Sequence, residues 1–376
     1  MTILGYANKD LFVELPQISS VSLDTTVYQE FVYDGFAKKY TLYYVNKGIK
    51  INCNDNSNTQ NSRVTVKIAI GMNAPYIDSN VTVDPTTNPL FEWIFKNGNK
   101  FALLANQNLT KDDNIIDFTI GKQINSSSYT EDPTKSVSNL ILAGQVTGLI
   151  ILELDLEGIG STNGSITIYN SSYEKNVNSG YTQGNKIKVA SLTGIDLSNF
   201  DAISSFNINS IFSHWNGAYH SMKLNTEFVI IGDTSLTDAW VYTQQIKNKG
   251  TDDDWGLSDY NNLNDIPLKN SSGVSVSDNG KKESLIINPL SINQQAMEVS
   301  KLAIIAIAKT TDGSPTTLQG YVKTPINGDT LLNTETVSDE NTYMRFDCDV
   351  NPDTNYKWQF ADLATMQIGV ISGGKA

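Results

Sequence analysis

The chain has 376 residues, of which 39% are hydrophobic and 18% are charged, and its net charge at pH 7 is −13. Arg63 and Arg345 are its only arginines, so the sequence lacks the basic stripe with which nucleic-acid-binding proteins neutralise phosphates. The same deficit argues against attraction to anionic lipid surfaces. At roughly 100–200 residues per domain, the length predicts two domains. The 17 Tyr, 13 Phe and 5 Trp indicate folded cores rather than disorder.

The sequence predicts neither a secretory signal nor a membrane-spanning segment. The first residues lack the basic and apolar regions of a secretory signal, and the longest apolar run, 302–308, is far shorter than the ~20 residues that span a bilayer. Cys53 and Cys348 stand outside any Cys-x-x-Cys or zinc spacing, so we expect two unpaired thiols.

Strand patterns dominate the chain in order. Aromatic, β-branched or alternating runs that end at Gly, Asn, Asp or Ser predict strands at 40–45, 64–70, 149–156, 165–169, 227–231, 238–243, 284–287, 299–308 and 343–350. A Thr-Asn-Gly turn at 162–164 predicts a hairpin. Segment 91–96 fits either a helical turn or a strand, 196–211 is loop-like, and 360–368 has apolar residues at both spacings. These patterns predict an all-β protein with two β-sandwich, jelly-roll-like domains.

A polar stretch with two glycines at 180–188, followed by a new pattern from Asp196, predicts the boundary between the domains. We place it near residue 195. The N-terminal domain then covers 1–195 and the C-terminal domain covers 196–376.

The sequence offers few groups for catalysis. His214 and His220 are the only histidines, and the Gly-x-Ser-x-Gly, His-Glu-x-x-His, Walker and Gly-x-Gly-x-x-Gly motifs are absent. Glu153, Asp155 and Glu157 alternate along one predicted strand, which places three carboxylates on one face. Because burying three like charges is costly, we expect that face to meet solvent. The sequence therefore predicts no catalytic site, no cofactor and no metal centre.

Two groups of residues remain candidates for ligand contact. Asp252-Asp253-Asp254 is the densest acidic cluster, and the sequence leaves open whether this loop binds calcium or only forms a solvated turn. Trp215, Tyr219 and Trp255, with Asp253, supply rings and a carboxylate of the kind that contact sugars, although such aromatics equally fill a sandwich core.

The segment 349–370 resembles a recurring ending of tailed-bacteriophage virion proteins. That ending runs Asp-Pro-x-Thr-Gly-x-x-Trp-Thr, then x-x-Asp-Val or Asp-Leu, then Leu-Gln-x-Gly-Val. The matching residues are Pro352, Thr354, Trp358, Asp362, Leu363, Gln367, Gly369 and Val370. Asn351 replaces the leading Asp, Asn355 the Gly and Met366 the Leu, and asparagine tolerates the positive φ that glycine adopts in turns. The likeness extends more loosely over the last 170 residues or so of the chain, in the order of its strands.

The physical sense of this motif is structural. Asn-Pro begins a turn, and Trp358, flanked by Lys357 and Gln359, points opposite to both and therefore inward. Residues 366–370 form the last strand. We expect Pro352, Trp358, Asp362, Gln367 and Gly369 to hold the fold rather than to react.

The resemblance implies a structural, non-enzymatic component of a tailed-phage virion, assembled in the host cytoplasm. Tail fibre, tail-tip component and head-decoration protein all fit, and the N-terminal domain would serve particle attachment or assembly. Other virion proteins and further copies of the chain are the expected partners. The alternative is a receptor adhesin that recognises a host-surface glycan. A depolymerase would need a carboxylate pair in a cleft and long parallel-helix repeats, which the sequence does not show.

Overall fold

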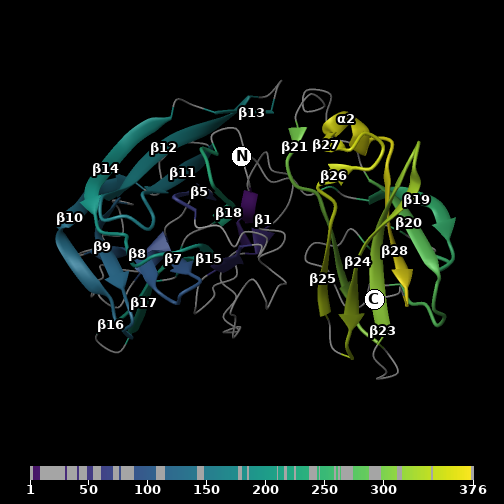
Figure 1. The fold of residues 1–376 in the computed structure, drawn as a ribbon, viewed down its shortest axis with the longest axis horizontal. Coiled ribbons are helices and arrows are strands. Elements are labelled where there is room, and N and C mark those ends of the chain that lie inside the picture. The colour runs from purple at the N-terminus through teal and green to yellow at the C-terminus, as the bar shows by residue number, and fades with distance from the viewer. Residues whose placement is uncertain are drawn as a thin grey trace. The chain divides into compact units, whose positions relative to one another are not determined.

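The computed structural model describes residues 3–8, 30–31, 40–41, 49–53, 61–70, 76–77, 89–106, 115–141, 148–176, 180–183, 186–209, 211–215, 218–223, 226–236, 244, 246–257, 260, 263, 274–287, 298–310, 316–339 and 342–373. The chain folds into two compact units, Met1–Val241 (unit 1) and Tyr242–Ala376 (unit 2) (Figure 1). The described residues are almost entirely strands in antiparallel sheets, which confirms the all-β prediction. No helix among them is long and apolar enough to cross a membrane.

Unit 1 is built on two large antiparallel sheets. The β11 sheet contains β1 (Ile3–Asn8), β5 (Arg63–Ile70), β11 (Gly148–Glu157), β12 (Gly164–Asn176), β13 (Gly180–Gln183), β14 (Ile187–Ile195) and β18 (Thr226–Gly232). Its order is β1-β18-β5-β11-β12-β13, and β14 pairs with the same edge of β12 as β13 does. The β7 sheet contains β4 (Ile49–Asn52), β7 (Pro89–Phe95), β8 (Lys100–Asn106), β9 (Ile115–Gln123), β10 (Thr130–Ile141) and β15 (Ile203–Ile208), in the order β10-β9-β8-β7-β15-β4.

Short strands complete unit 1. They are the pair β2 (Glu30–Phe31) and β3 (Tyr40–Thr41), and the hairpin of β16 (Ile211–Trp215) and β17 (Ala218–Lys223), which also pairs with β6 (Tyr76–Ile77).

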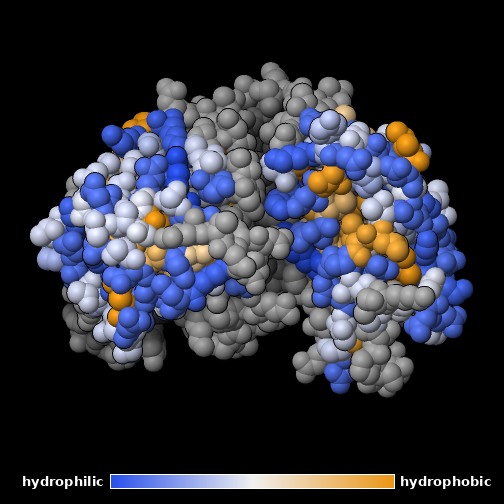
Figure 2. All heavy atoms as spheres, viewed as in Figure 1, coloured by the Kyte–Doolittle hydropathy of each residue, from blue (hydrophilic) through white to orange (hydrophobic). Residues whose placement is uncertain are grey.

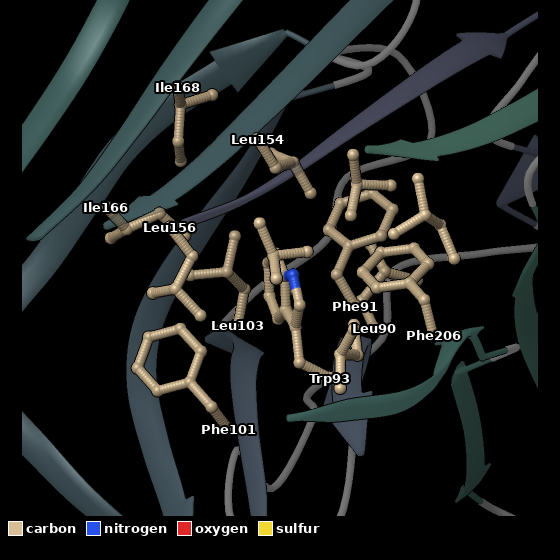
Figure 3. Close-up of a cluster of buried hydrophobic side chains, with 14 of the residues drawn as sticks. Leu90, Phe91, Trp93, Phe101, Leu103, Leu154, Leu156, Ile166, Ile168 and Phe206 are labelled. Atoms are coloured by element: carbon tan, nitrogen blue, oxygen red, sulfur yellow. The ribbon is translucent and has the colours of Figure 1, made fainter. Parts of the chain in front are cut away.

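One core lies between the two large sheets of unit 1. The inward side chains of the β11 sheet, such as Leu154 and Ile166, share a buried cluster with Phe91, Trp93 and Phe206 of the β7 sheet (Figure 3). The rings of Trp93 and Phe206 meet edge-on with centroids 5.0 Å apart. Period-two alternation sends these residues to one face of each strand, so unit 1 is a sandwich.

Unit 2 has a five-stranded sheet, called here the β28 sheet. It contains β19 (Ile246–Asp253), β20 (Lys282–Ile287), β23 (Thr316–Thr324), β24 (Gly328–Val337) and β28 (Gln367–Ser372), in the order β19-β20-β28-β23-β24. Two smaller sheets accompany it: β22 (Ala303–Ala308) pairs with β25 (Thr342–Asp347), and β27 (Tyr356–Gln359) pairs with β21 (Glu298–Val299) and β26 (Val350–Asn351). The helix α2 (Phe360–Leu363) joins β27 to the segment that leads into β28. Leu318 and Val322 of the β28 sheet share a core with Ile304, Met344 and Phe346 of the β22–β25 pair.

The structure corrects the boundary expected near residue 195. Four strands beyond that point, β15 to β18, belong to unit 1. Two of them join its large sheets, because β15 pairs with β4 and β7, and β18 pairs with β1 and β5. The division lies between Val241 and Tyr242. Residues 91–95 of the segment 91–96 lie in strand β7, and the loop-like segment 196–211 contains β15. The strand predicted at 238–243 lies outside the described residues.

Candidate functional site

The acidic cluster at 252–254 begins in a bulge of β19. Lys249 lies opposite Leu285 and Asp253 lies opposite Glu283, so residues 250–252 face the single residue Ser284. The bulge packs closely on its neighbours, since a Cβ on Gly250 would lie 2.2 Å from Ser284 Oγ. The N–H of Asp252 donates to Ser284 Oγ at 2.9 Å. A glycine at 250 is therefore what allows the bulge to sit over the β28 sheet.

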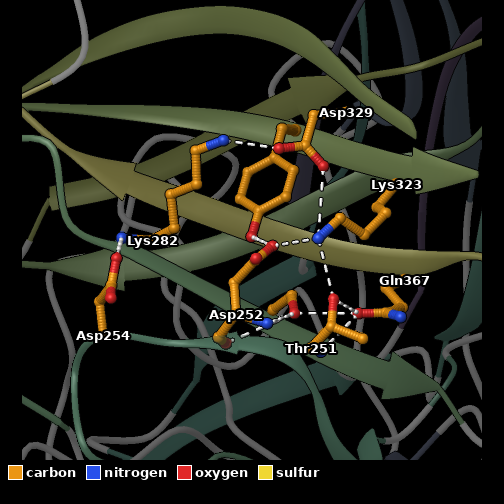
Figure 4. Close-up of polar contacts among 9 residues, drawn as sticks. Thr251, Asp252, Asp254, Lys282, Lys323, Asp329 and Gln367 are labelled. Atoms are coloured by element: carbon orange, nitrogen blue, oxygen red, sulfur yellow. Dashed lines mark hydrogen bonds and ion pairs between the residues drawn. The ribbon is translucent and has the colours of Figure 1, made fainter. Parts of the chain in front are cut away.

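Asp252 is the centre of a polar network on that sheet (Figure 4). Its Oδ2 accepts hydrogen bonds from the Tyr321 hydroxyl at 2.9 Å and from Lys323 Nζ at 2.7 Å. Partial burial alone would raise the pKa of Asp252, but these bonds from Lys323 and Tyr321 outweigh it and hold the pKa below its usual value. The same contact raises the pKa of Lys323. Asp252 is thus an ionised carboxylate with its partners inside the fold.

A second carboxylate extends the network. Asp329 Oδ2 lies 2.5 Å from Lys282 Nζ, and Asp329 Oδ1 lies 3.5 Å from Lys323 Nζ. Lys323 also donates to Thr251 Oγ1 at 2.8 Å. Burial and the bond to Asp252 raise the pKa of Tyr321, so its hydroxyl stays protonated near neutral pH. Two lysines and two aspartates thereby tie β19, β20, β23 and β24 together, and the arrangement stabilises the bulge.

The neighbouring acids point to other partners. Asp253 is exposed and pairs with Lys249 at 2.8 Å, while Asp254 Oδ2 accepts the N–H of Lys282 at 3.0 Å. Within the described residues, no three His, Cys, Asp or Glu side chains are grouped so that they could hold a metal ion. The sequence left open whether this triplet binds calcium. In the structure, its three carboxylates make three separate contacts within the protein.

The predicted ligand-contact aromatics do not gather around these acids within one unit. Trp255 is half-buried against the core of unit 2, and its indole N–H donates to the Lys281 carbonyl at 3.0 Å. Trp215 and Tyr219 lie on the β16–β17 hairpin of unit 1, and their side chains lie outside the described part of the structure. Asp253 and Trp255 share a segment of unit 2, and both make contacts within the protein.

Sequence reasoning missed a buried acid next to this segment. Glu283 is 2% exposed, and its Oε2 accepts the N–H of Trp255 at 3.3 Å. Its Oε1 has no hydrogen-bond partner. Burial raises the pKa of Glu283, and the nearby charge of Asp253 raises it further. The only signal in the sequence is a charged residue opening an apolar run, 283–287.

The C-terminal motif forms the turn and the anchor that were expected of it. Trp358 is 1% exposed, and its Nε1 donates to the Cys348 carbonyl at 2.8 Å. Asn351 Oδ1 accepts the N–H of Asp353 at 2.9 Å, which builds the turn around Pro352. Asn355 has φ +59°, the conformation that glycine would supply at this place. The inward direction derived for Trp358 from strand alternation is therefore confirmed.

The remaining motif residues also make contacts inside the fold. Asp362 accepts the Gln359 N–H at 2.9 Å and so caps α2. Gln367 Oε1 accepts the N–H of Thr251 at 2.9 Å, which links β28 to the β19 bulge. A Cβ on Gly369 would lie 2.3 Å from the Tyr321 ring, so this position admits only glycine without repacking. The motif therefore contacts the Asp252 network, through Gln367 at Thr251 and through Gly369 at the Tyr321 ring.

The expectation that the Glu153–Asp155–Glu157 face meets solvent is wrong. Glu153 and Asp155 are 3% and 4% exposed, and only Glu157 is exposed. Each buried acid has a cation beside it, since Lys186 Nζ lies 2.6 Å from Glu153 Oε1 and Arg63 Nε donates to Asp155 Oδ1 at 2.7 Å. Pairing with these cations lowers the cost of burial that the prediction relied on.

A similar buried acid lies on the β7 sheet. Glu92 is 4% exposed and accepts hydrogen bonds from Asn207 Nδ2 at 2.6 Å, from Lys100 Nζ at 3.2 Å and from the Tyr129 hydroxyl. Burial and the charge of Glu92 raise the pKa of Tyr129. These three partners hold the Glu92 side chain in place inside the fold, which suits a structural role.

Two of the most exposed apolar side chains lie on two adjoining turns, called here the tip (residues 325–328 and 352–356). Ile326 is 78% exposed and Tyr356 is 77% exposed. Asp353 joins the turns, because its Oδ1 accepts the N–H of Asn327 at 2.8 Å and the Thr324 hydroxyl at 2.6 Å. Figure 2 shows that the described surface on this face of the molecule is mostly polar, with some apolar side chains gathered on unit 2.

Comparison of the sequence with known protein families and with curated proteins gives no match. Evidence on function therefore comes from the contacts of residues 349–370 and of the Asp252 network.

Proposed function

We propose that the chain is a structural component of a tailed-phage particle and acts through protein–protein assembly. The observation that carries this proposal is the contact pattern of the C-terminal motif. Pro352, Trp358, Asp362, Gln367 and Gly369, the residues through which the sequence resembles phage virion proteins, each make a packing or hydrogen-bond contact that shapes unit 2. A motif of this kind defines a fold rather than a reaction.

The charge of the chain supports the same function. Each copy carries a net charge of −13, which favours solubility before assembly. The buried acids described above are matched by Lys, Arg, Tyr or Asn partners, with Glu283 the exception. Such pairing fixes strand register and supports a rigid building block.

The experiment is to purify particles of the virus that encodes the chain on a density gradient and to analyse them by mass spectrometry. The expected result is that peptides of this chain co-sediment with the major capsid protein at a constant ratio. A chain that stays in the soluble fraction of the lysate would contradict the proposal.

The tip favours a second function, that of an adhesin for a host-surface glycan. Asp353 holds the two turns in place, so Tyr356 is presented as a preorganised, exposed ring that can stack on the apolar face of a sugar. Tyr356 is a better candidate for sugar contact than Trp255, because Trp255 is half-buried and its indole N–H already donates to the Lys281 carbonyl.

Glycan arrays with the purified chain test the adhesin function. Tyr356→Ala should abolish binding to any glycan that the wild type retains, and Leu331→Ala, which changes a side chain 57% exposed on β24 of the same unit, is the matched surface control. Binding that both variants preserve, or no binding by the wild type, would leave assembly as the function.

A further inference from the structure

We propose that β14 is an assembly edge at which a second copy of this chain pairs, antiparallel, with the same strand. Of the strands in the described part of the chain, only β12 pairs with β14. Figure 1 shows β14 at the margin of unit 1, with β12 beside it. A strand in this position offers a row of backbone donors and acceptors to an incoming strand.

Five side chains of β14 are exposed, whereas Ala190 and Leu192 pack against the core. Ile187 is 64% exposed and Val189 is 39% exposed, and Lys188, Ser191 and Thr193 are exposed as well. Natural edges are blunted by charges, prolines or short length. β14 has nine residues, no proline and one charged side chain, Lys188. Its register against β12 shifts at two places, and β10 approaches it at Thr193, so the stretch between these points, around Ser191, is the open part of the edge.

The backbone of Ser191 faces away from β12. Lys135 of β10 donates to the Thr193 carbonyl at 2.6 Å, which marks Thr193 as a residue whose backbone groups point outward. Residues of an antiparallel strand alternate between pointing toward and away from their partner, so Ser191, two positions earlier, points outward too. Lys135 occupies the carbonyl of Thr193. By the same alternation, the N–H and C=O of Ser191 are the groups that an incoming strand would meet.

The lack of acidic residues along β14 makes a second copy of this chain the partner strand that fits this edge. Two chains of net charge −13 repel each other over most of their surfaces, but no Asp or Glu occurs between residues 175 and 195. When two β14 strands pair antiparallel in a register centred on Ala190 or Ser191, each Lys188 faces a neutral residue, Leu192 or Gly194. The edge is therefore self-complementary, as a twofold interface requires.

Sedimentation equilibrium of the full-length chain tests the proposal. The wild type should form a reversible dimer. Ser191→Pro should weaken the dimer by about tenfold or more, because it removes an outward N–H and places a ring in the path of the partner strand. An outward-facing edge N–H is the position at which a strand accepts proline, so β12 pairing should persist. Ser191→Ala keeps the N–H and should dimerise as the wild type does.

Two further variants keep the result interpretable. Val189→Lys alters a side chain that is already exposed and should also weaken the dimer, whereas Lys135→Met frees the Thr193 carbonyl and should strengthen it. The amide of Ser191 should exchange more slowly with solvent as protein concentration rises. A wild type that is monomeric at every concentration, or Ser191→Pro and Ser191→Ala variants that dimerise equally, would overturn the proposal.

Discussion

Replacing Trp358 by alanine should destabilise unit 2 strongly. The indole is 1% exposed, contacts the core of that unit and donates its N–H to the Cys348 carbonyl. Truncating a buried tryptophan costs about 3–5 kcal/mol through lost burial and the cavity left behind. The orphaned carbonyl of Cys348 adds a cost of about 1 kcal/mol if water cannot reach it. Against a total stability of about 5–15 kcal/mol, a loss of this size leaves unit 2 marginal or unfolded.

Urea denaturation of the full chain, followed by hydrogen exchange of β28, measures this effect. Trp358→Phe should lose less, because the ring still fills part of the space. Tyr356→Ala, on the same strand but 77% exposed, is the matched control and should stay within about 0.5 kcal/mol of the wild type. The reasoning fails if Trp358→Ala unfolds at the same urea concentration as the control.

Three further variants probe two buried acids and one closely packed glycine. The folded-state pKa of Glu283 lies above its unfolded value, so the folded state binds the proton more tightly and stability falls as pH rises through that interval. Glu283→Gln should therefore be more stable than the wild type at pH 7. It should lose this advantage near pH 4, about the pKa of the unfolded side chain, and thermal melts across pH would measure it. A difference in melting temperature that stays constant with pH would show that the Glu283 charge is not its cause. Gly369→Ala should cost about 1–3 kcal/mol, since its Cβ would lie 2.3 Å from the Tyr321 ring, and an unchanged midpoint in urea would show that the ring can move freely. Asp155→Ala should cost about 3 kcal/mol in the unfolding of unit 1, because Arg63 and Thr65 lose their shared acceptor; a double variant with Arg63→Met should recover part of that loss, and no recovery would show that the two residues are not coupled.

The strands of the fold were predictable where their signal is local. Alternation and the Thr-Asn-Gly turn indicated the β11–β12 hairpin, and alternation around Trp358 gave its inward direction. The domain boundary was not predictable in this way. Strands β15 and β18 return to sheets formed by residues more than 100 positions earlier, and no local pattern reports such pairing.

The polar networks escaped prediction for the same reason. Asp252 depends on Tyr321 and Lys323, which are 69 and 71 residues away in the chain. Asp155 depends on Arg63, which is 92 residues away. A row of alternating acids looks like a solvated face until the cations that approach it are known. The structural contacts of the C-terminal motif were easier to foresee, since its turn and its cap are formed by neighbours in sequence.

Gold-labelled antibodies against the chain, applied to purified particles and viewed by electron microscopy, test the central claim most directly. If the chain is a structural component of a tailed-phage particle, the label should appear at one fixed location on every particle, on the head or on the tail. Gold that is absent from intact particles, while the same antibodies detect the chain in the surrounding lysate, would contradict the account.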